Sequence, residues 1–247
     1  MVGIIDQTNR GMGRNVAYVQ KMAAQAGVEI THATGYYKEP FLPPECYTLT
    51  EQQLCDIMVK ELTEGMEGTG VRATVIGEIG TSKDITETEA KVFRAASRAH
   101  AETGAPICTH TTLGMRGLEQ LEIFKSFGVD LSRVVLSHID LSADLDYMKR
   151  LLDQGVNIAF DTIGKCNYQP DVSRADWLSR LCAEGYDTQI VMSMDITRRS
   201  NFADRGGVGY SYLLDTFAPL ASEAGVPDRA WENLLYRNAL RIYKGQK

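Results

Sequence analysis

The sequence predicts an α/β protein in which parallel strands alternate with helices, as in a closed (β/α)8 barrel. Three observations predict this fold. Short apolar runs alternate with amphipathic stretches along the whole 247-residue chain, a pattern typical of a parallel sheet. No shift in composition marks a domain boundary, so residues 1–247 are expected to form a single domain. Four of the apolar runs deliver a histidine or a carboxylate at their C-terminal ends, where the active sites of such barrels lie.

The composition narrows the class of protein. Hydrophobic residues make up 44% of the chain, so a large core can form without disulfides. The five cysteines contain no Cys-x-x-Cys pair, and Cys108 and Cys182 are expected to be buried free thiols of a reducing compartment. The net charge of −6 includes no basic block that would bind nucleic acid. Since no signal peptide and no membrane-length apolar run is present, we expect a soluble cytoplasmic protein without membrane partners.

The first half of the chain contains four expected strands and three expected helices. The strands are expected at residues 2–6, 28–34, 71–80 and 105–110, and the helices at residues 15–26, 50–64 and 86–103. Thr50 and Thr86 are typical N-caps, and Glu89 completes a capping box with Thr86. Gly27 follows the first helix at the position where glycine commonly ends one.

The second half continues the alternation. Strands are expected at residues 133–138, 156–161 and 189–195, and helices at residues 115–127, 142–154, 171–184, 210–224 and 228–243. This gives seven strands, whereas a closed barrel of this type has eight. An open doubly wound sheet is the alternative, but no Gly-x-Gly-x-x-Gly motif opens a helix after a strand. The run Gly206-Gly-Val-Gly209 lies in a late loop and indicates phosphate binding only weakly.

Four residues of the metal-ligand type stand at the ends of four different expected strands: Glu78, His110, His138 and Asp195. Because the C-terminal ends of parallel barrel strands converge on one face, we expect these residues to meet around a divalent metal. Imidazole and carboxylate ligands together favour Zn, Mn, Fe or Co over Mg or Ca. Such a metal lowers the pKa of a coordinated water to about 7 and makes hydroxide available. Glu78 is suited to bridge two metals, and Asp195 to bind one metal and accept a proton.

Other polar residues have simpler explanations. A single histidine at a strand end is more often structural than a ligand, so the prediction depends on the joint occurrence of all four residues. Asp161, at the end of another expected strand, is expected to be a cap or a supporting group. His100 lies inside a helix and is expected to be structural, and His32 is expected in the core or in support of the site. Lys165 could form a Schiff base, but a solvated loop lysine is the simpler expectation.

Seven motifs, in order along the chain, resemble those of the phosphotriesterase family of the amidohydrolase superfamily. They are Thr8-Asn-Arg-Gly-Met-Gly-Arg14, Ala33-Thr-Gly-Tyr-Tyr37, Gly77-Glu-Ile-Gly-Thr-Ser82, Thr109-His-Thr111, Ser137-His-Ile-Asp140, Phe160-Asp-Thr-Ile-Gly164 and Ser193-Met-Asp-Ile-Thr-Arg-Arg199. The resemblance covers essentially the whole chain. It implies a TIM barrel with a binuclear metal centre, usually zinc, whose metals are bridged by a carboxylated lysine or, in the homology-protein branch, by a glutamate.

The resemblance also implies roles for individual residues. Glu78 stands at the position of the bridging glutamate. His110 and His138 match the two histidines of the more exposed metal, and Asp195 matches the aspartate that binds the buried metal and shuttles protons. Tyr37 matches an aromatic position that lines the substrate pocket of the family's lactonases. Arg198, on the loop after the last strand, is expected to contact the substrate.

The sequence departs from the family in one respect. The family carries a His-x-His pair on its first strand, and this sequence has four histidines but no such pair. We therefore expect the chain to begin within the family's second strand, without the first strand, its helix and two metal ligands. This expectation also accounts for the count of seven strands. It predicts one well-held metal rather than two, and hydrolysis that is weakened or lost.

The sequence as a whole predicts a zinc-dependent hydrolase of a small-molecule substrate, in which metal-bound hydroxide attacks an ester, lactone or phosphoester. A homodimer is a candidate assembly. One alternative is a catalytically inactive family member that acts as a binding or structural protein, which the missing His-x-His pair favours. A more remote alternative is a lyase that uses Lys165 as a Schiff base.

Overall fold

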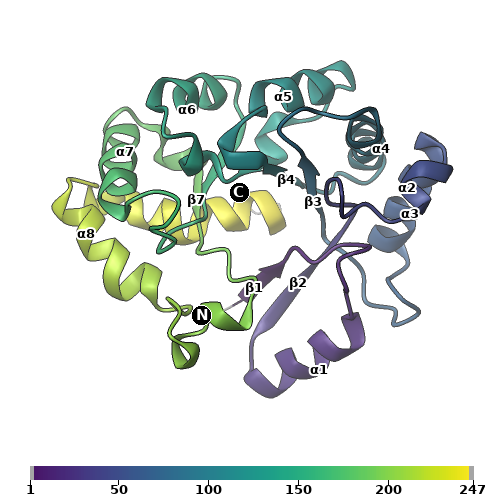
Figure 1. Ribbon diagram of the computed structural model, residues 1–247, viewed down its shortest axis with the longest axis horizontal. Helices are drawn as coiled ribbons and strands as arrows, with labels where there is room; N and C mark the ends of the chain where they lie inside the picture. The colour runs from purple at the N-terminus through teal and green to yellow at the C-terminus, as the bar shows by residue number, and fades with distance from the viewer. Residues whose placement is uncertain (1–2, 245–247) are drawn as a thin grey trace. The chain divides into compact units, whose positions relative to one another are not determined.

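The computed structural model of the protein describes residues 3–244 (Figure 1). Its seven strands form one sheet in which each strand lies beside its neighbours in the sequence. The strands are β1 (Gly3–Asp6), β2 (Glu29–Thr34), β3 (Val75–Thr81), β4 (Ile107–Thr111), β5 (Val134–Ser137), β6 (Asn157–Phe160) and β7 (Ile190–Met192). The pairs β1/β2, β2/β3, β3/β4 and β6/β7 are parallel. A doubly wound sheet reverses its strand order at a switch point, so the consecutive order favours the barrel type of sheet.

The helices follow the strands as the alternation predicts. They are α1 (Val16–Ala26), α2 (Glu45–Thr48), α3 (Glu51–Thr63), α4 (Glu87–Thr103), α5 (Gly117–Ser126), α6 (Leu145–Leu152), α7 (Asp171–Ala183) and α8 (Ala218–Glu223). The short α2 was not expected in its proline-rich loop. No helix among residues 3–244 is both long and apolar enough to cross a membrane.

The two C-terminal helices differ from their prediction. The segment expected to be one helix over 210–224 is a π-helical turn, Leu213–Phe217, followed by α8. Pro219 sits in the first turn of α8, and because proline has no N–H it cannot extend an α-helix that comes before it. The helix expected over 228–243 is a 3₁₀ turn, Asp228–Ala230, and two π-helical segments, Asn233–Arg237 and Leu240–Lys244.

The chain falls into two compact units, of which unit 1 holds residues up to 112 together with 116–135, and unit 2 holds 113–115 together with the residues from 136 on. The expectation of a single domain over 1–247 stays a prediction.

Unit 1 is built on β1 to β4, with α3 packed on α4 and α4 packed on β3 and α5. Phe93 of α4 stacks on Phe124 of α5, with ring centroids 5.3 Å apart. The predicted N-cap Thr50 and the predicted capping box of Thr86 with Glu89 are confirmed, and Thr50 also forms a capping box with Gln53. Gly27 is confirmed as a left-handed C-cap. These local signals place the helix ends so that the apolar faces meet in one core.

Gly77 shows why the backbone before Glu78 requires glycine. Its φ is +145°, a conformation that other residues avoid. A Cβ at this position would lie 2.2 Å from the carbonyl oxygen of Cys108 on β4. The missing side chain therefore allows β3 and β4 to approach closely beside the residue that is predicted to bind metal.

Unit 2 contains the β6/β7 pair, with α6 packed on β6 and α7 packed on α8. The C-terminal segment is tied to the start of β7 through Asn238, whose Nδ2 donates to the backbone oxygens of Asp187 (2.8 Å) and Ile190 (2.7 Å). Across the whole chain, all five cysteines are free thiols, and the predicted burial of Cys108 and Cys182 is confirmed.

Candidate metal centre

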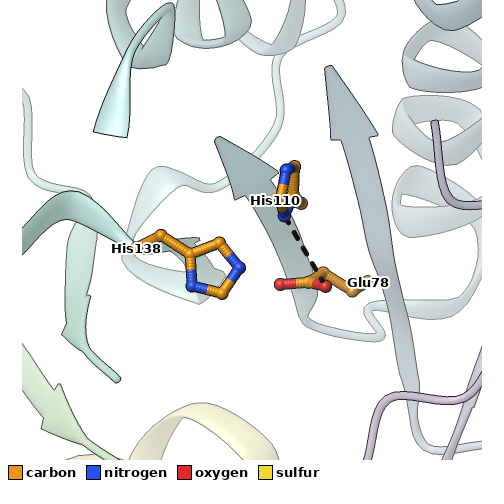
Figure 2. A group of neighbouring side chains, drawn as sticks. All are labelled: Glu78, His110 and His138. Atoms are coloured by element: carbon orange, nitrogen blue, oxygen red, sulfur yellow. Dashed lines mark ion pairs between the residues drawn. The ribbon is translucent and has the colours of Figure 1, made fainter. Parts of the chain in front are cut away.

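Glu78 and His110 lie on the neighbouring strands β3 and β4 of unit 1. Oε2 of Glu78 is 4.0 Å from Nδ1 of His110, the ion pair drawn as a dashed line in Figure 2. The side chains of Glu78 and His110 are 18% and 12% exposed, respectively, so both are largely buried but remain accessible to solvent. The register of the strands pairs Gly80 with His110, which lies one residue before the end of β4, whereas Glu78 lies in the middle of β3 rather than at its end.

Besides the carboxylate of Glu78, two neutral hydroxyls contact the His110 imidazole. The hydroxyl of Tyr37 lies 3.0 Å from its Nδ1, and the two rings meet edge to face at 71°. The hydroxyl of Thr112 lies 3.3 Å from its Nε2. Gln120 donates to the backbone oxygen of His110 at 2.9 Å. Tyr37 is therefore in direct contact with a predicted metal ligand, although its role toward a substrate stays a prediction.

Asn9 supports Glu78 and was not foreseen as a functional residue. Its Nδ2 donates to the backbone oxygen of Glu78 at 2.6 Å, and Asn9 is 1% exposed. The residue belongs to the motif Thr8-Asn-Arg-Gly-Met-Gly-Arg14, so a signal was present in the sequence. The contact joins residues 69 positions apart, which is why the motif alone did not reveal its partner.

His138 of unit 2 follows β5 in the left-handed conformation, with φ +62°. One oxygen of Asp161, Oδ1, accepts from the backbone N–H of His138 at 2.9 Å and lies 2.8 Å from its Nδ1. Because a carboxylate only accepts hydrogen bonds, Nδ1 carries the proton and Nε2 is the nitrogen suited to bind a metal. Asp161 is thus a supporting group, as expected.

Asp195 lies three residues beyond the end of β7, with φ +46°. Its carboxylate forms an ion pair with the ammonium group of Lys165. Burial raises the pKa of Asp195, as does the nearby charge of Asp161, against the opposing hydrogen bond from Lys165. Lys165 is only 15% exposed, so the expectation of a solvated lysine is wrong: the turn after β6 brings its side chain inward. Arg198 is exposed on its loop.

Arg174 lies at the centre of a buried charged cluster in unit 2 that the sequence does not predict. Nε of Arg174 donates to Oδ2 of Asp140 at 2.7 Å, Nη1 donates to Asp171 at 2.9 Å, and Nη2 donates to the hydroxyl of Thr162 at 2.7 Å. Arg174 and Asp140 are both 0% exposed. Burial, followed by the charge of Asp161, raises the pKa of Asp140, although Thr162 and Arg174 donate to it. Asp140 stood in a recognised motif, whereas nothing in the sequence distinguishes Arg174 from a solvated helix residue.

The two remaining histidines are structural, as predicted. His32 is 2% exposed, its Nε2 lies 2.8 Å from the amide nitrogen of Gln20, and burial lowers its pKa. His100 has Nδ1 2.8 Å from the backbone oxygen of Ala105, and its Nε2 accepts from the backbone N–H of Asp130 at 3.3 Å. Neither residue has a geometry that suggests metal binding.

Known proteins resemble this chain over most of its length. The model of the phosphotriesterase family matches residues 1–243. The chain belongs to the phosphotriesterase family. A phosphotriesterase homology protein of Escherichia coli is 42% identical over 242 residues, which cover 98% of this chain and 83% of that protein. An N-acetyltaurine hydrolase of Danio rerio is 31% identical over 250 residues, covering 96% of this chain and 72% of that protein.

Solved structures of the family resemble the fold closely. The crystal structure of the E. coli homology protein, which holds phosphate in its active site, superposes with a TM-score of 0.95 over 98% of this chain and 83% of that chain. A lactonase from Listeria monocytogenes superposes with a TM-score of 0.93 at 28% identity, over 100% of this chain and 82% of that chain. These relatives support an α/β fold with a parallel sheet, and they identify the chain as a hydrolytic enzyme.

Proposed function

We propose that Glu78, His110 and His138 hold one divalent metal ion, and that the chain is a metal-dependent hydrolase of a small-molecule ester, lactone or phosphoester. The observation that carries the proposal is the pairing of Glu78 with His110 in unit 1 (Figure 2), in a chain that belongs to the phosphotriesterase family. In unit 2, His138 offers Nε2 as a ligand atom, because Asp161 engages its Nδ1. The strand-end pattern of the sequence predicts these three residues, together with Asp195, as metal ligands.

The donor set fits such an ion. Metal–nitrogen and metal–oxygen bonds of about 2.1 Å place two ligand atoms of one ion at most about 4.2 Å apart. The 4.0 Å between Oε2 of Glu78 and Nδ1 of His110 satisfies this limit. Two imidazoles and one carboxylate suit zinc, manganese, iron or cobalt. Among these, zinc is our first choice because it accepts low coordination numbers.

The ion, when bound, supplies Lewis acidity that polarises the bond under attack and lowers the pKa of water. The protein's own groups do the rest. Asp195 is placed to accept a proton, since burial raises the pKa of its carboxylate against the opposing ion pair with Lys165. The hydroxyl of Tyr37, beside His110, orients the substrate. Arg198 contributes from its exposed loop to binding rather than to chemistry.

The test combines metal analysis with a substrate screen. Protein purified with added zinc or manganese is expected to carry one equivalent of metal and to hydrolyse at least one compound from a panel. The panel contains a lactone, an aryl ester, a phosphotriester and, because relatives are N-acetyltaurine hydrolases, N-acetyltaurine. Glu78→Gln is expected to abolish both metal binding and turnover.

Glu122→Gln makes the same chemical change at an exposed position of unit 1 and is expected to alter neither property. A protein that binds no transition metal, and in which Glu78→Gln changes nothing, would rule out the hydrolase. Metal binding without turnover of any compound would favour the inactive binding protein. Borohydride trapping of substrate on Lys165 would instead favour the lyase.

A further inference from the structure

Asp161 contacts His138 at two points through one atom. Its Oδ1 accepts from the backbone N–H at 2.9 Å and from Nδ1 of the ring at 2.8 Å. The side chains of His138 and Asp161 are 10% and 11% exposed, so water competes little with these bonds. A single carboxylate oxygen thus fixes both the backbone and the ring of His138.

The backbone of His138 needs this support. A non-glycine residue with φ +62° is strained by about 1–2 kcal/mol, and His138 opens the 3₁₀ turn Ile139–Ser142 in that conformation. The bond from its N–H to Asp161 orients the first peptide of the turn. The direction of the imidazole therefore depends on Asp161 twice, through the turn and through the ring.

The Arg174 cluster holds the two turns that carry these residues. Asp140 lies two residues after His138, and Thr162 directly follows Asp161. The guanidinium of Arg174 bonds to Asp140 at 2.7 Å and to Thr162 at 2.7 Å, and the hydroxyl of Thr162 donates to Asp140 at 2.5 Å. One buried cation of α7 therefore joins the turn after β5 to the turn after β6.

We propose that Asp161 is a positioning residue that fixes His138 in the Nδ1–H tautomer and presents Nε2 to the metal, while Arg174 keeps the two turns together through Asp140 and Thr162. The inference rests on the proposed function, in which His138 is a ligand. A carboxylate behind a ligating histidine raises the basicity of the imidazole and fixes its orientation, and loss of such a group typically weakens metal binding about 10- to 100-fold.

The experiment measures the tautomer of His138 and the zinc affinity separately. In metal-free protein, ¹⁵N NMR of the histidine rings is expected to show His138 as the Nδ1–H tautomer, with its signal assigned by loss in His138→Gln. Asp161→Asn keeps the shape and an acceptor but loses the charge, and is expected to bind zinc about 10- to 100-fold more weakly. Asp161→Ala loses both and is expected to bind zinc more weakly still and to change the tautomer signal.

The matched control is Asp187→Asn. Asp187 is also buried in unit 2 and is bonded to Asn233 and Arg229, but it precedes β7 rather than following a strand. The Asp187→Asn variant is expected to change neither the NMR signal of His138 nor the zinc affinity. An Nε2–H tautomer in the wild-type protein, or unchanged zinc affinity in Asp161→Asn, would overturn the positioning role. The Nδ1–H tautomer in a wild-type protein that binds no zinc would support that role for Asp161 and overturn the metal centre instead.

Discussion

The two units support their predicted metal ligands in different ways. In unit 1, His110 contacts the neutral hydroxyls of Tyr37 and Thr112. In unit 2, His138 is bonded twice to the carboxylate of Asp161. A charge-assisted hydrogen bond is about twice as strong as a neutral one, so His138 is held more firmly in one tautomer. The carboxylate of Glu78 lies 4.0 Å from Nδ1 of His110, beyond hydrogen-bond distance, so we expect His138 to be the more rigid of the two predicted ligands.

The buried ionic clusters of the two units also differ, in the number of arginines bonded to each buried acid. In unit 1, Glu61 accepts from two arginines, Arg10 at 2.8 Å and Arg14 at 2.7 Å, and from Thr34 at 2.6 Å. Burial alone would raise the pKa of Glu61, but these hydrogen bonds bring the pKa below its usual value. In unit 2, Arg174 donates to two carboxylates, Asp140 and Asp171, and burial raises the pKa of Asp140. Glu61 is thus bonded to two arginines, although these also bind Glu45 and Glu67, whereas Asp140 shares its one arginine with Asp171.

The largest expected effect tests the cluster of unit 2. Arg174→Met would leave Asp140 buried without its cation, which typically costs about 3–5 kcal/mol in the free energy of unfolding. Denaturation by urea measures this loss. The control Arg180→Met lies on the same helix, where Arg180 is 60% exposed, and is expected to cost about 0.5 kcal/mol or less. Adding Asp140→Asn to Arg174→Met should recover part of the loss, and a double variant less stable than the single one would contradict the pairing.

The next effect compares the two histidines directly. Tyr37→Phe removes a neutral hydrogen bond at His110, worth about 0.5–1.5 kcal/mol, and is expected to weaken zinc binding by about tenfold or less. This is a smaller change than the one expected for Asp161→Asn. Calorimetric titration of both variants at one pH measures the difference. Equal losses would mean that the two ligands are supported equally.

A smaller effect concerns acid stability in unit 1. Because the folded-state pKa of Glu61 is lowered, its ionised form stabilises the fold fully above the unfolded value of about 4.5. This contribution is lost as the pH falls below that value toward the folded-state pKa. Glu61→Gln is therefore expected to be less stable at pH 7 and to lose less stability on acidification. Denaturation at a series of pH values tests this, with Glu64→Gln as the control, since Glu64 is the exposed C-cap residue of the same helix.

The smallest expected effect is that of Arg198→Ala. The residue is exposed on its loop, so stability should change by less than about 0.5 kcal/mol. If Arg198 binds substrate, KM should rise while kcat and zinc affinity stay unchanged. An unchanged KM for every hydrolysed compound would remove Arg198 from the predicted site without affecting the metal centre.

Much of the local structure followed from the sequence. Thr50, Thr86 and Gly27 fixed helix ends because capping depends on neighbouring residues and not on the rest of the fold. The four candidate ligands could be selected because each follows an apolar run that can form only a buried strand. The C-terminal π-helical segments could not be predicted, since apolar periodicity does not distinguish hydrogen-bond spacings of four and five residues.

The sequence by itself determined the order of strands and helices, the family, and the residues most suited to bind a metal. Only the tertiary structure decided which charges meet. Lys165 lies 30 residues from Asp195, and Arg174 lies 34 residues from Asp140. Such pairings depend on which turns the strands bring together, and on burial that makes an unpaired charge costly. Local patterns carry no information about either, so Arg174, the residue that joins the turns beside His138, was visible only in the folded chain.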